Sequence, residues 1–349
     1  MPVTIKSIAA EAGVSYQAVS AVLNGKTNCR VSPQRREQIL QIAQKSGYRP
    51  SFGYKLMRGH ATHTVAIVVG MHQIESDEHV RELLLKLMQK LNHRGYSTYF
   101  NNMMTPDAEN NIREIRDLIT RGAEHFIFIG SPVGHLEIEA ELIRNRRTFI
   151  GWGSHFSRNL SSNSFDTSIL LMEYLFAKSG SFPLLITPEN SLNGARYNAL
   201  QSVLAKNGLA DSIEDYTIKT QQLSWEEKNF SARAFELGYQ GTANAFSRNK
   251  APKALAYFTD NFALGGIAWC YEHGIQIGKE VFLSGFNNIE AIRTTPFPVA
   301  SAAHEIENAI EILLQQMTET EPFSQKLALK LHLRPENKTI TLQQKGIKQ

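Results

Sequence analysis

The stretch TIKSIAAEAGVSYQAVSAVLN, residues 4–24, predicts two short helices joined by a glycine turn. In its first half, apolar residues recur at i, i+3, i+4 and i+7 and form one stripe of a helix: Ile5, Ile8, Ala9 and Ala12. Thr4 precedes this helix and has a side chain suited to capping it. Gly13 supplies the left-handed backbone that a sharp turn needs, and Ser15 caps the second helix.

The second helix is predicted to have an apolar inner face and a polar outer face. The inner positions are Ala18, Val19, Val22 and Leu23. The outward positions are Tyr16, Gln17, Ser20, Ala21 and Asn24. A helix that presents small and polar side chains, at a steep angle to its predecessor, is suited to enter a DNA major groove. A helical hairpin with no role in DNA binding is the alternative.

A third helix completes this N-terminal head. Ser32 caps it, Pro33 occupies its first turn, and Gly47 ends it. Its inner stripe consists of Ile39, Ile42 and Ala43. The polar loop NGKTNCRV before it carries Lys26 and Arg30, which we expect to reach the phosphate backbone of DNA.

Positive charge is concentrated at the N-terminal end of the chain. Up to His63 there are nine Lys and Arg residues and two Glu residues, nine minus two or +7, whereas the whole chain carries +4. The rest of the chain therefore carries −3. A positive head on a mildly acidic body suits phosphate binding by one end of the molecule.

The length of 349 residues indicates two or three folded units. No apolar run is long enough for a membrane span, and the chain starts directly with the helix signal, so we expect a cytoplasmic protein. Cys29 and Cys270 lie far apart and in separate expected domains, which favours free thiols over a disulfide.

The segments VTIKSIAAEAGVSYQAVSAVLNG, VSPQRREQIL and SGYRP closely resemble the headpiece of the lactose/galactose repressor family of bacterial transcription regulators. The resemblance runs from residue 3 to about 70 and continues more loosely over the rest. It implies that Tyr16 and Gln17 read base edges, with Ser20 and Asn24 nearby. The expected DNA-binding residues are Thr4, Ser15, Tyr16, Gln17, Ser20, Ala21, Asn24, Lys26, Arg30 and Met57.

Ala21 departs from the family pattern, which has arginine after the serine of this helix. Arginine reads guanine with two hydrogen bonds, whereas alanine offers only a methyl group, to a thymine or to nothing. We therefore expect an operator that differs from the common family consensus at this base pair. The loop before the third helix is also about two residues longer than usual in the family.

Residues 51–63 form a linker, in which Ser51 caps a short helical segment and Gly53 weakens it. In similar proteins this hinge helix lies in the minor groove, where a leucine wedges between base steps. The corresponding residue here is Met57, which is apolar and unbranched. Packing of Leu56 and Met57 against the large domain is the alternative.

From Thr64 onward, strand-like apolar runs alternate with helices. The runs are TVAIVVG, STYF, HFIFIG, RTFIGWG, FPLLITP, KALAYFT and EVFLSGF. They predict parallel sheets covered on both faces, and there are too many for one sheet. The resemblance implies a periplasmic-binding-protein-like domain of two doubly wound lobes, with chain crossings near residues 162, 291 and 322.

The expected organisation is thus a helix-turn-helix headpiece at 1–50, a hinge at 51–63 and an effector-binding and dimerisation domain at 64–349. Its N-subdomain comprises about 64–162 and 291–322, and its C-subdomain comprises about 163–290 and 323–349.

Parallel α/β lobes bind ligands at the carboxyl ends of their strands. Candidate effector residues therefore follow strands: His72, Ser131, Asn190, Arg196, Asp260 and Asn287. The resemblance assigns effector contacts to Asn190 and Arg196, places Asp260 at the cleft rim, and has an aspartate where Asn287 stands. Trp225 is a further candidate, to stack on a ligand.

Each candidate has an alternative role. Asn287 and Asn288 are suited to cap the following helix, and Arg196 to form a surface ion pair. His72 is also consistent with a solvated loop, and Trp225 with covering a lobe edge.

The sequence lacks G-x-S-x-G and G-x-x-x-x-G-K-[ST], and its histidines and cysteines lack metal-ligand spacing, so no enzyme activity, cofactor or metal ion is expected. An enzyme fused to a DNA-binding head is the alternative. We expect a transcriptional repressor that binds a near-palindromic operator in double-stranded DNA as a homodimer, controlled by a sugar-like small-molecule effector. The C-terminal segment has no sustained leucine heptad, so we expect a dimer without an additional tetramer-forming helix.

Overall fold

The computed structural model describes residues 3–23, 29–48, 61–70, 74, 78–102, 105–224, 229–333 and 338–341, the last segment by its backbone alone. The chain divides into two compact units, Met1–Thr62 and His63–Gln349. Asn24, Lys26, Met57, His72 and Trp225 lie outside the described residues. Within them, no helix is both long and apolar enough to cross a bilayer.

The first unit contains α1 (Ile5–Ala12), α2 (Tyr16–Leu23) and α3 (Pro33–Lys45). The predicted caps of the three helices are confirmed. Thr4 Oγ1 accepts from the Ser7 N–H in a reciprocal capping box, and the hydroxyls of Ser15 and Ser32 accept from the third residue after each. Gly13 has φ 63°, the left-handed turn predicted for it.

One small apolar core joins the three helices. Its buried members are Ile5, Ile8, Ala9, Ala12, Val19, Val22, Ile39 and Ala43. Arg35 adds a polar tie, because its Nη1 donates to the carbonyl oxygen of Ala12 at 2.9 Å. Arg35 thereby satisfies one of the free carbonyls at the end of α1.

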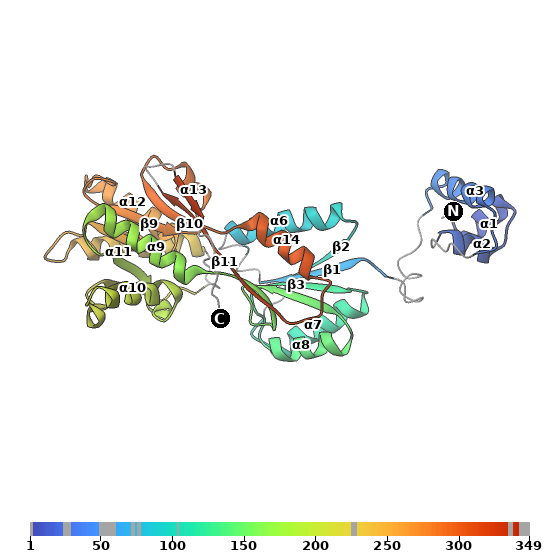
Figure 1. Ribbon diagram of the computed structural model, residues 1–349, viewed down its shortest axis with the longest axis horizontal. Coiled ribbons are helices and arrows are strands. Elements are labelled where there is room, and N and C mark those ends of the chain that lie inside the picture. The colour runs from blue at the N-terminus through green and yellow to red at the C-terminus, as the bar shows by residue number, and fades with distance from the viewer. Residues whose placement is uncertain are drawn as a thin grey trace. The chain divides into compact units, whose positions relative to one another are not determined.

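The N-lobe of the second unit is built on a parallel sheet with strand order β11-β5-β4-β3-β1-β2 (Figure 1). The strands are β1 (Thr64–Val69), β2 (Ser97–Asn102), β3 (His125–Ile129), β4 (Thr148–Trp152), β5 (Arg158–Ser162) and β11 (Phe323–Leu327). The helices are α6 (Glu78–His93), α7 (Ala108–Thr120), α8 (His135–Arg144) and α14 (Ile306–Gln316). Alternate residues of β1 pack against α6 and α14 on one face and against α7 and α8 on the other.

The C-lobe is built on a second sheet with order β13-β12-β10-β9-β8-β6-β7, in which β12 and β13 run antiparallel to their neighbours. The strands are β6 (Leu184–Pro188), β7 (Thr217–Thr220), β8 (Ala254–Tyr257), β9 (Phe282–Phe286), β10 (Val299–Ala303), β12 (Lys330–Leu333) and β13 (Lys338–Thr341). The helices are α9 (Ser164–Ser179), η1 (Glu189–Ser191), α10 (Ala195–Lys206), η2 (Ala210–Ser212), α11 (Phe230–Phe246), α12 (Asp260–Glu272) and α13 (Glu290–Thr294). Helices α9 and α10 cover one face, and α11 and α12 cover the other.

The chain passes between the two sheets three times. It leaves the N-lobe after β5, returns between β10 and α14, and leaves again between β11 and β12. The first passage lies where it was expected, near residue 162. The second lies at 304–305 instead of near 291, because β10, whose sequence VASAA lacks large apolar residues, adds one more strand to the C-lobe first. The third lies at 328–329 instead of near 322, because β11 pairs with β5 before the chain leaves.

Candidate functional site

The outward face of α2 carries the side chains predicted to read bases. Tyr16 is 38% exposed and Gln17 is exposed, whereas Ser20 and Ala21 are half-buried. Val19 on the opposite face is fully buried and holds α2 against its neighbours. This arrangement leaves the polar face of the second helix of a helix-turn-helix open to solvent.

Three other predicted DNA-binding residues are exposed, and two of them also cap helices. Thr4 and Ser15 are exposed, and their hydroxyls cap α1 and α2. Arg30 is exposed in the described part of the loop before α3, residues 29–32. Capping leaves the O–H donor of the Ser15 hydroxyl available for a DNA phosphate, because a hydroxyl has one donor and two acceptor sites.

In the second unit, a cavity of about 280 Å³ opens at the carboxyl ends of β3, β4 and β5. Its described lining is His79, Val80, Ile129, Gly130, Trp152, Gly153, Ser161, Ser162, Ser164 and His304. Strands of a parallel α/β sheet expose ligand sites at this end. We call this cavity, with the C-lobe residues next to it, the cleft.

Two histidines form one wall of the cleft. The rings of His79, in the first turn of α6, and His304, directly after β10, stack with centroids 4.2 Å apart and planes inclined by 11°. The Nδ1 atom of His304 is 2.8 Å from the hydroxyl oxygen of Ser162. Trp152 meets His304 edge-on at 6.1 Å between ring centroids. The pair therefore joins an N-lobe helix to two of the crossing segments.

Arg196, in the first turn of α10, lies beside this pair. Its guanidinium carbon stands 3.8 Å from the ring centroid of Phe286 and 4.8 Å from that of Phe258. Phe286 is the last residue of β9, and Phe258 directly follows β8. Their rings therefore hold the guanidinium at the carboxyl edge of the C-lobe sheet. Such cation–π contacts stabilise by about 1–2 kcal/mol when partly desolvated.

Burial and positive charge keep both histidines neutral. The pKa of His79 is lowered to about 4, first by burial and then by the charges of Arg196 and Arg81. The pKa of His304 is well below its ordinary value, by burial and then by His79 and Arg196. Among the described residues, the buried Nδ1 of His79 has no hydrogen-bond partner. A bound ligand is suited to supply that partner.

Asp260 lies beneath the cleft instead of at its rim, which corrects the prediction. It is fully buried as the first residue of α12. Its Oδ1 accepts from the Ser301 hydroxyl at 2.7 Å, and its Oδ2 accepts from the Ile289 N–H at 2.8 Å. Burial raises the pKa of Asp260 to about 6. Asp260 therefore holds the turn after β9 in place.

That turn contains Asn287 and Asn288, with φ values of 101° and 50°. The alternative that they cap α13 is wrong, because Ile289 is the cap residue and no side chain bonds there. Asparagine tolerates left-handed backbone better than most residues, which accounts for the pair. The Asn287 N–H donates to the Ala302 carbonyl oxygen at 2.8 Å, and the half-buried Asn287 follows β9 as predicted.

Asn190 and Ser131 also follow strands, yet both bind neighbouring loops. The Asn190 amide donates to the Leu223 carbonyl oxygen at 2.8 Å and accepts from the Leu223 N–H. The Ser131 hydroxyl accepts from the His155 N–H at 2.6 Å. In the structure these two side chains therefore shape the loops at the carboxyl ends.

Sequence reasoning missed His79, Trp152, Ser162 and His304. Trp152 and Ser162 end strands and His304 follows one, so the rule used for the other candidates would have found them. Ser162 and His304 were lost because β5 and β10 were not recognised as strands. Nothing in the sequence singled out His79, which lies in a helix.

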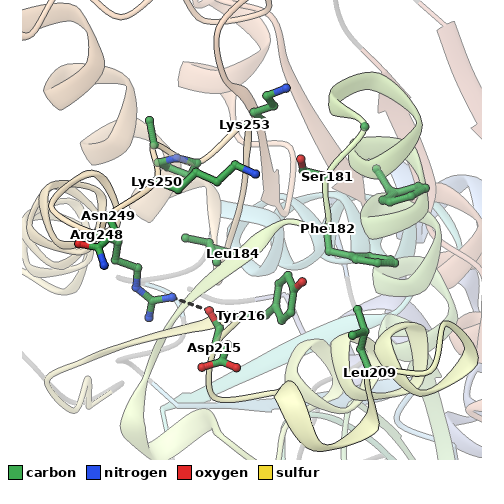
Figure 2. A pocket seen from close by; sticks show the side chains of 14 residues that line it. Ser181, Phe182, Leu184, Leu209, Asp215, Tyr216, Arg248, Asn249, Lys250 and Lys253 are labelled. Carbon is green, nitrogen blue, oxygen red and sulfur yellow. Dashed lines mark hydrogen bonds between the residues drawn. The ribbon is translucent and has the colours of Figure 1, made fainter.

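A larger hollow of about 800 Å³ lies at the other end of the C-lobe sheet, at the amino ends of β6 and β8 (Figure 2). Phe182 and Tyr216 line it with rings at right angles, and Arg248 donates to the backbone carbonyl oxygens of Asp215 and Thr217. It is therefore separate from the cleft.

The two units of the chain match two different families of known proteins. Residues 4–51 match the profile described as "Bacterial regulatory proteins, lacI family". Residues 4–51 are a lacI-family DNA-binding domain. Residues 182–335 match the "Periplasmic binding protein-like domain". The protein is a DNA-binding transcription regulator with an effector-binding domain.

Three similar proteins span nearly the whole chain. The HTH-type transcriptional repressor PurR of Histophilus somni is 23% identical over 337 residues, covering 90% of this chain and 92% of the relative. A Lac repressor dimer bound to operator and the anti-inducer ONPF superposes with a TM-score of 0.73 and 18% identity, covering 95% and 98%. A CelR–cellobiose complex gives 0.58 and 17%, covering 94% and 98%.

Proposed function

We propose that the protein is a repressor whose headpieces, paired in a homodimer, bind a near-palindromic operator, and whose cleft binds a sugar-like effector that changes operator affinity. The observation that carries this proposal is the presence, in one chain, of an open polar face on α2 and of a cleft lined by aromatic rings and a few polar groups. Small-molecule sites have this composition.

The relatives support each part of this proposal. The PurR relative is named as a repressor, and the Lac repressor structure is a dimer on its operator. The CelR structure holds cellobiose. Of the residues that line the cavity, Trp152 offers an apolar ring and Ser162 a hydroxyl group to a sugar.

Two exposed apolar side chains support pairing through the N-lobe. Leu85 on α6 is 68% exposed, and Phe100 on the edge strand β2 is 43% exposed. An apolar group beside an open sheet edge is suited to contact with a second copy.

The test is a selection from random duplex DNA with the full-length protein, followed by release assays with a panel of sugars. The proposal requires enrichment of a near-palindromic sequence whose binding at least one small molecule alters. Retention of all duplexes alike, with no response to any sugar, contradicts it.

Gln17→Ala is expected to relax base preference at one position of each half-site by about 1–3 kcal/mol, because it removes an exposed amide from α2. Competition binding with operators substituted at single positions measures this change. Gln44→Ala removes the same group from an exposed position of α3 and is expected to leave the preference intact. Equal weakening of Gln17→Ala on random DNA would contradict base reading.

Ala21→Arg is expected to shift the selected half-site toward guanine, because a guanidinium fork binds the guanine edge with two hydrogen bonds. The expected discrimination is about 1–3 kcal/mol. Repeating the DNA selection measures it. Ala10→Arg adds the same charge at an exposed position of α1 and controls for attraction to phosphates. The same selected site for wild type and Ala21→Arg would refute the prediction.

A further inference from the structure

Glu78 joins the two lobes at a point away from the three crossings. It is the first residue of α6 in the N-lobe, and its partners lie on α13 in the C-lobe. The N–H of Glu290 donates to Oε1 of Glu78 at 3.0 Å and to Oε2 at 3.2 Å. Nη2 of Arg293 donates to Oε1 at 3.3 Å. We call these contacts the latch; they connect residues 212 and 215 positions apart in the chain.

The C-lobe side of the latch is tied to the body of that lobe. Nη1 of Arg293 donates to the carbonyl oxygen of Asn288 at 2.7 Å, so one guanidinium binds both Glu78 and the turn after β9. The buried carboxylate of Asp260 holds the same turn through the Ile289 N–H. The latch therefore ends on a segment that is fixed within the C-lobe, and a force on it acts on the lobe as a whole.

The N-lobe side of the latch adjoins the cleft. Glu78 precedes His79, whose ring stacks on that of His304 and lines the cavity. The lining combines N-lobe residues such as Trp152 with Ser164, the first residue of α9 in the C-lobe. The shape of the cavity therefore depends on the spacing of the two lobes, and the latch contributes to that spacing.

The exposure of the latch determines its strength. The side chains of Glu78 and Arg293 are 31% and 47% exposed, and an ion pair this exposed contributes little by itself. The bonds from a charged carboxylate to the Glu290 N–H are stronger than bonds between neutral groups. A contact of this kind shifts the balance between two lobe spacings without locking the lobes together.

We propose that Glu78 and Arg293 are positioning residues for effector binding, and that the latch holds the lobes at the spacing that the cavity requires. This inference rests on the proposed effector role of the cleft and adds a control on its geometry. An effector that contacts both lobes binds this spacing more tightly than a wider one. The latch therefore raises the apparent affinity for the effector, although neither residue needs to touch it.

The spacing of the lobes is measured on the full-length protein, without effector, by pulsed electron paramagnetic resonance between two spin labels. Glu137→Cys on α8 and Lys206→Cys on α10 are exposed label sites, one on each lobe, in a Cys29→Ser background. Labelled chains are diluted in an excess of unlabelled chains, so that only distances within one chain are recorded. Glu78→Ala is expected to lengthen or broaden the distance distribution relative to wild type.

Three further variants separate the latch from general effects of substitution. Glu82→Ala is the matched control: it removes a carboxylate one turn later on α6, whose partner Lys86 lies in the same helix, and is expected to leave the distribution unchanged. Glu78→Gln keeps an acceptor for the Glu290 N–H and is expected to give an intermediate distribution. Arg293→Lys keeps the charge and is expected to stay closer to wild type than Arg293→Ala.

Salt gives a readout that a merely structural role of Glu78 would not show. The partly exposed ion pair is screened at about 1 M sodium chloride, where the screening length is about 3 Å. High salt is expected to move the wild-type distribution toward that of Glu78→Ala, and to change Glu78→Ala itself little. Identical distributions for wild type, Glu78→Ala and Arg293→Ala overturn the proposal.

A second arm measures the effect of ribose, cellobiose, glucose and galactose on operator binding. For a sugar that acts on wild type, Glu78→Ala is expected to raise the half-maximal concentration about threefold, because a smaller fraction of the protein has the required spacing. The same half-maximal concentration for both proteins overturns this inference alone and leaves the proposed function standing. If no small molecule affects specific DNA binding, the proposed effector role fails and this inference fails with it.

Discussion

Replacing Gly238 with alanine is expected to lower the free energy of unfolding of the C-lobe by about 3 kcal/mol. Gly238 lies in α11 where this helix crosses α12, and a Cβ atom there would stand 2.0 Å from the Phe262 carbonyl oxygen. The contact is reciprocal, since a Cβ atom on Gly265 of α12 would stand 2.0 Å from the Phe235 carbonyl oxygen. The obstacles are backbone atoms, so the helices would have to separate.

The sign of this change distinguishes packing from helix propensity. Alanine favours a helix over glycine by about 1 kcal/mol, so propensity alone would stabilise the variant. Asn244→Ala, at an exposed position of the same helix, is the control and is expected to change the unfolding free energy by less than about 1 kcal/mol. Denaturant unfolding followed by circular dichroism measures both. An unchanged or higher stability of Gly238→Ala would show that the helices separate at little cost.

Arg196→Ala is expected to abolish the response to effector while leaving operator affinity within about twofold of wild type. The substitution removes the guanidinium that Phe258 and Phe286 hold at the cleft. Truncating one partner of a buried charged contact commonly costs about 2–5 kcal/mol of binding energy, which corresponds to at least about a 30-fold loss of effector affinity. The headpiece folds around its own core and does not depend on this residue.

Operator binding with and without the effector found by the sugar screen measures both quantities. Arg113→Ala, on the surface of α7, controls for the loss of one positive charge from the second unit. If Arg196→Ala weakens operator binding as strongly as it weakens the effector response, Arg196 has a structural role in the lobe. In that case the assignment of Arg196 to the effector site is wrong.

The left-handed turn after β9 shows how residue identity and tertiary contacts combine. The sequence predicted an effector contact for Asn287, with helix capping as the alternative role of Asn287 and Asn288. In the structure the buried carboxylate of Asp260 binds the Ile289 N–H and the Ser301 hydroxyl, and this pins the turn. Asp260 is distant in sequence from both partners, so no local pattern contained this role.

The helix ends of the headpiece and the apolar strands could be predicted from the sequence alone. Thr4, Ser15 and Ser32 cap helices through contacts with residues three positions away, and such contacts depend on local sequence only. Every residue of β1 is buried, and the continuous apolar run of such a strand predicts it from the sequence. The rule that ligand residues follow strands singled out Arg196, and its contact with an effector stays a prediction.

Strands with polar or small residues depended on their neighbours in the sheet. The sequences RNLSS of β5 and VASAA of β10 have weak strand signals, and they pair because β4, β11 and β9 lie beside them. Because β10 and β11 were not recognised as strands, the second and third crossings lie later in the chain than expected.

Sequence alone determined that this chain joins a DNA-binding headpiece to a two-lobed α/β domain, because helix caps, turns and apolar periodicity act over a few residues. Only the tertiary structure brought His79, His304 and Arg196 together, and Ser162 contacts His304 across 142 positions of the chain. Burial and the charges of residues distant in sequence keep His79 and His304 neutral. The burial and these charges both depend on how the two lobes fold.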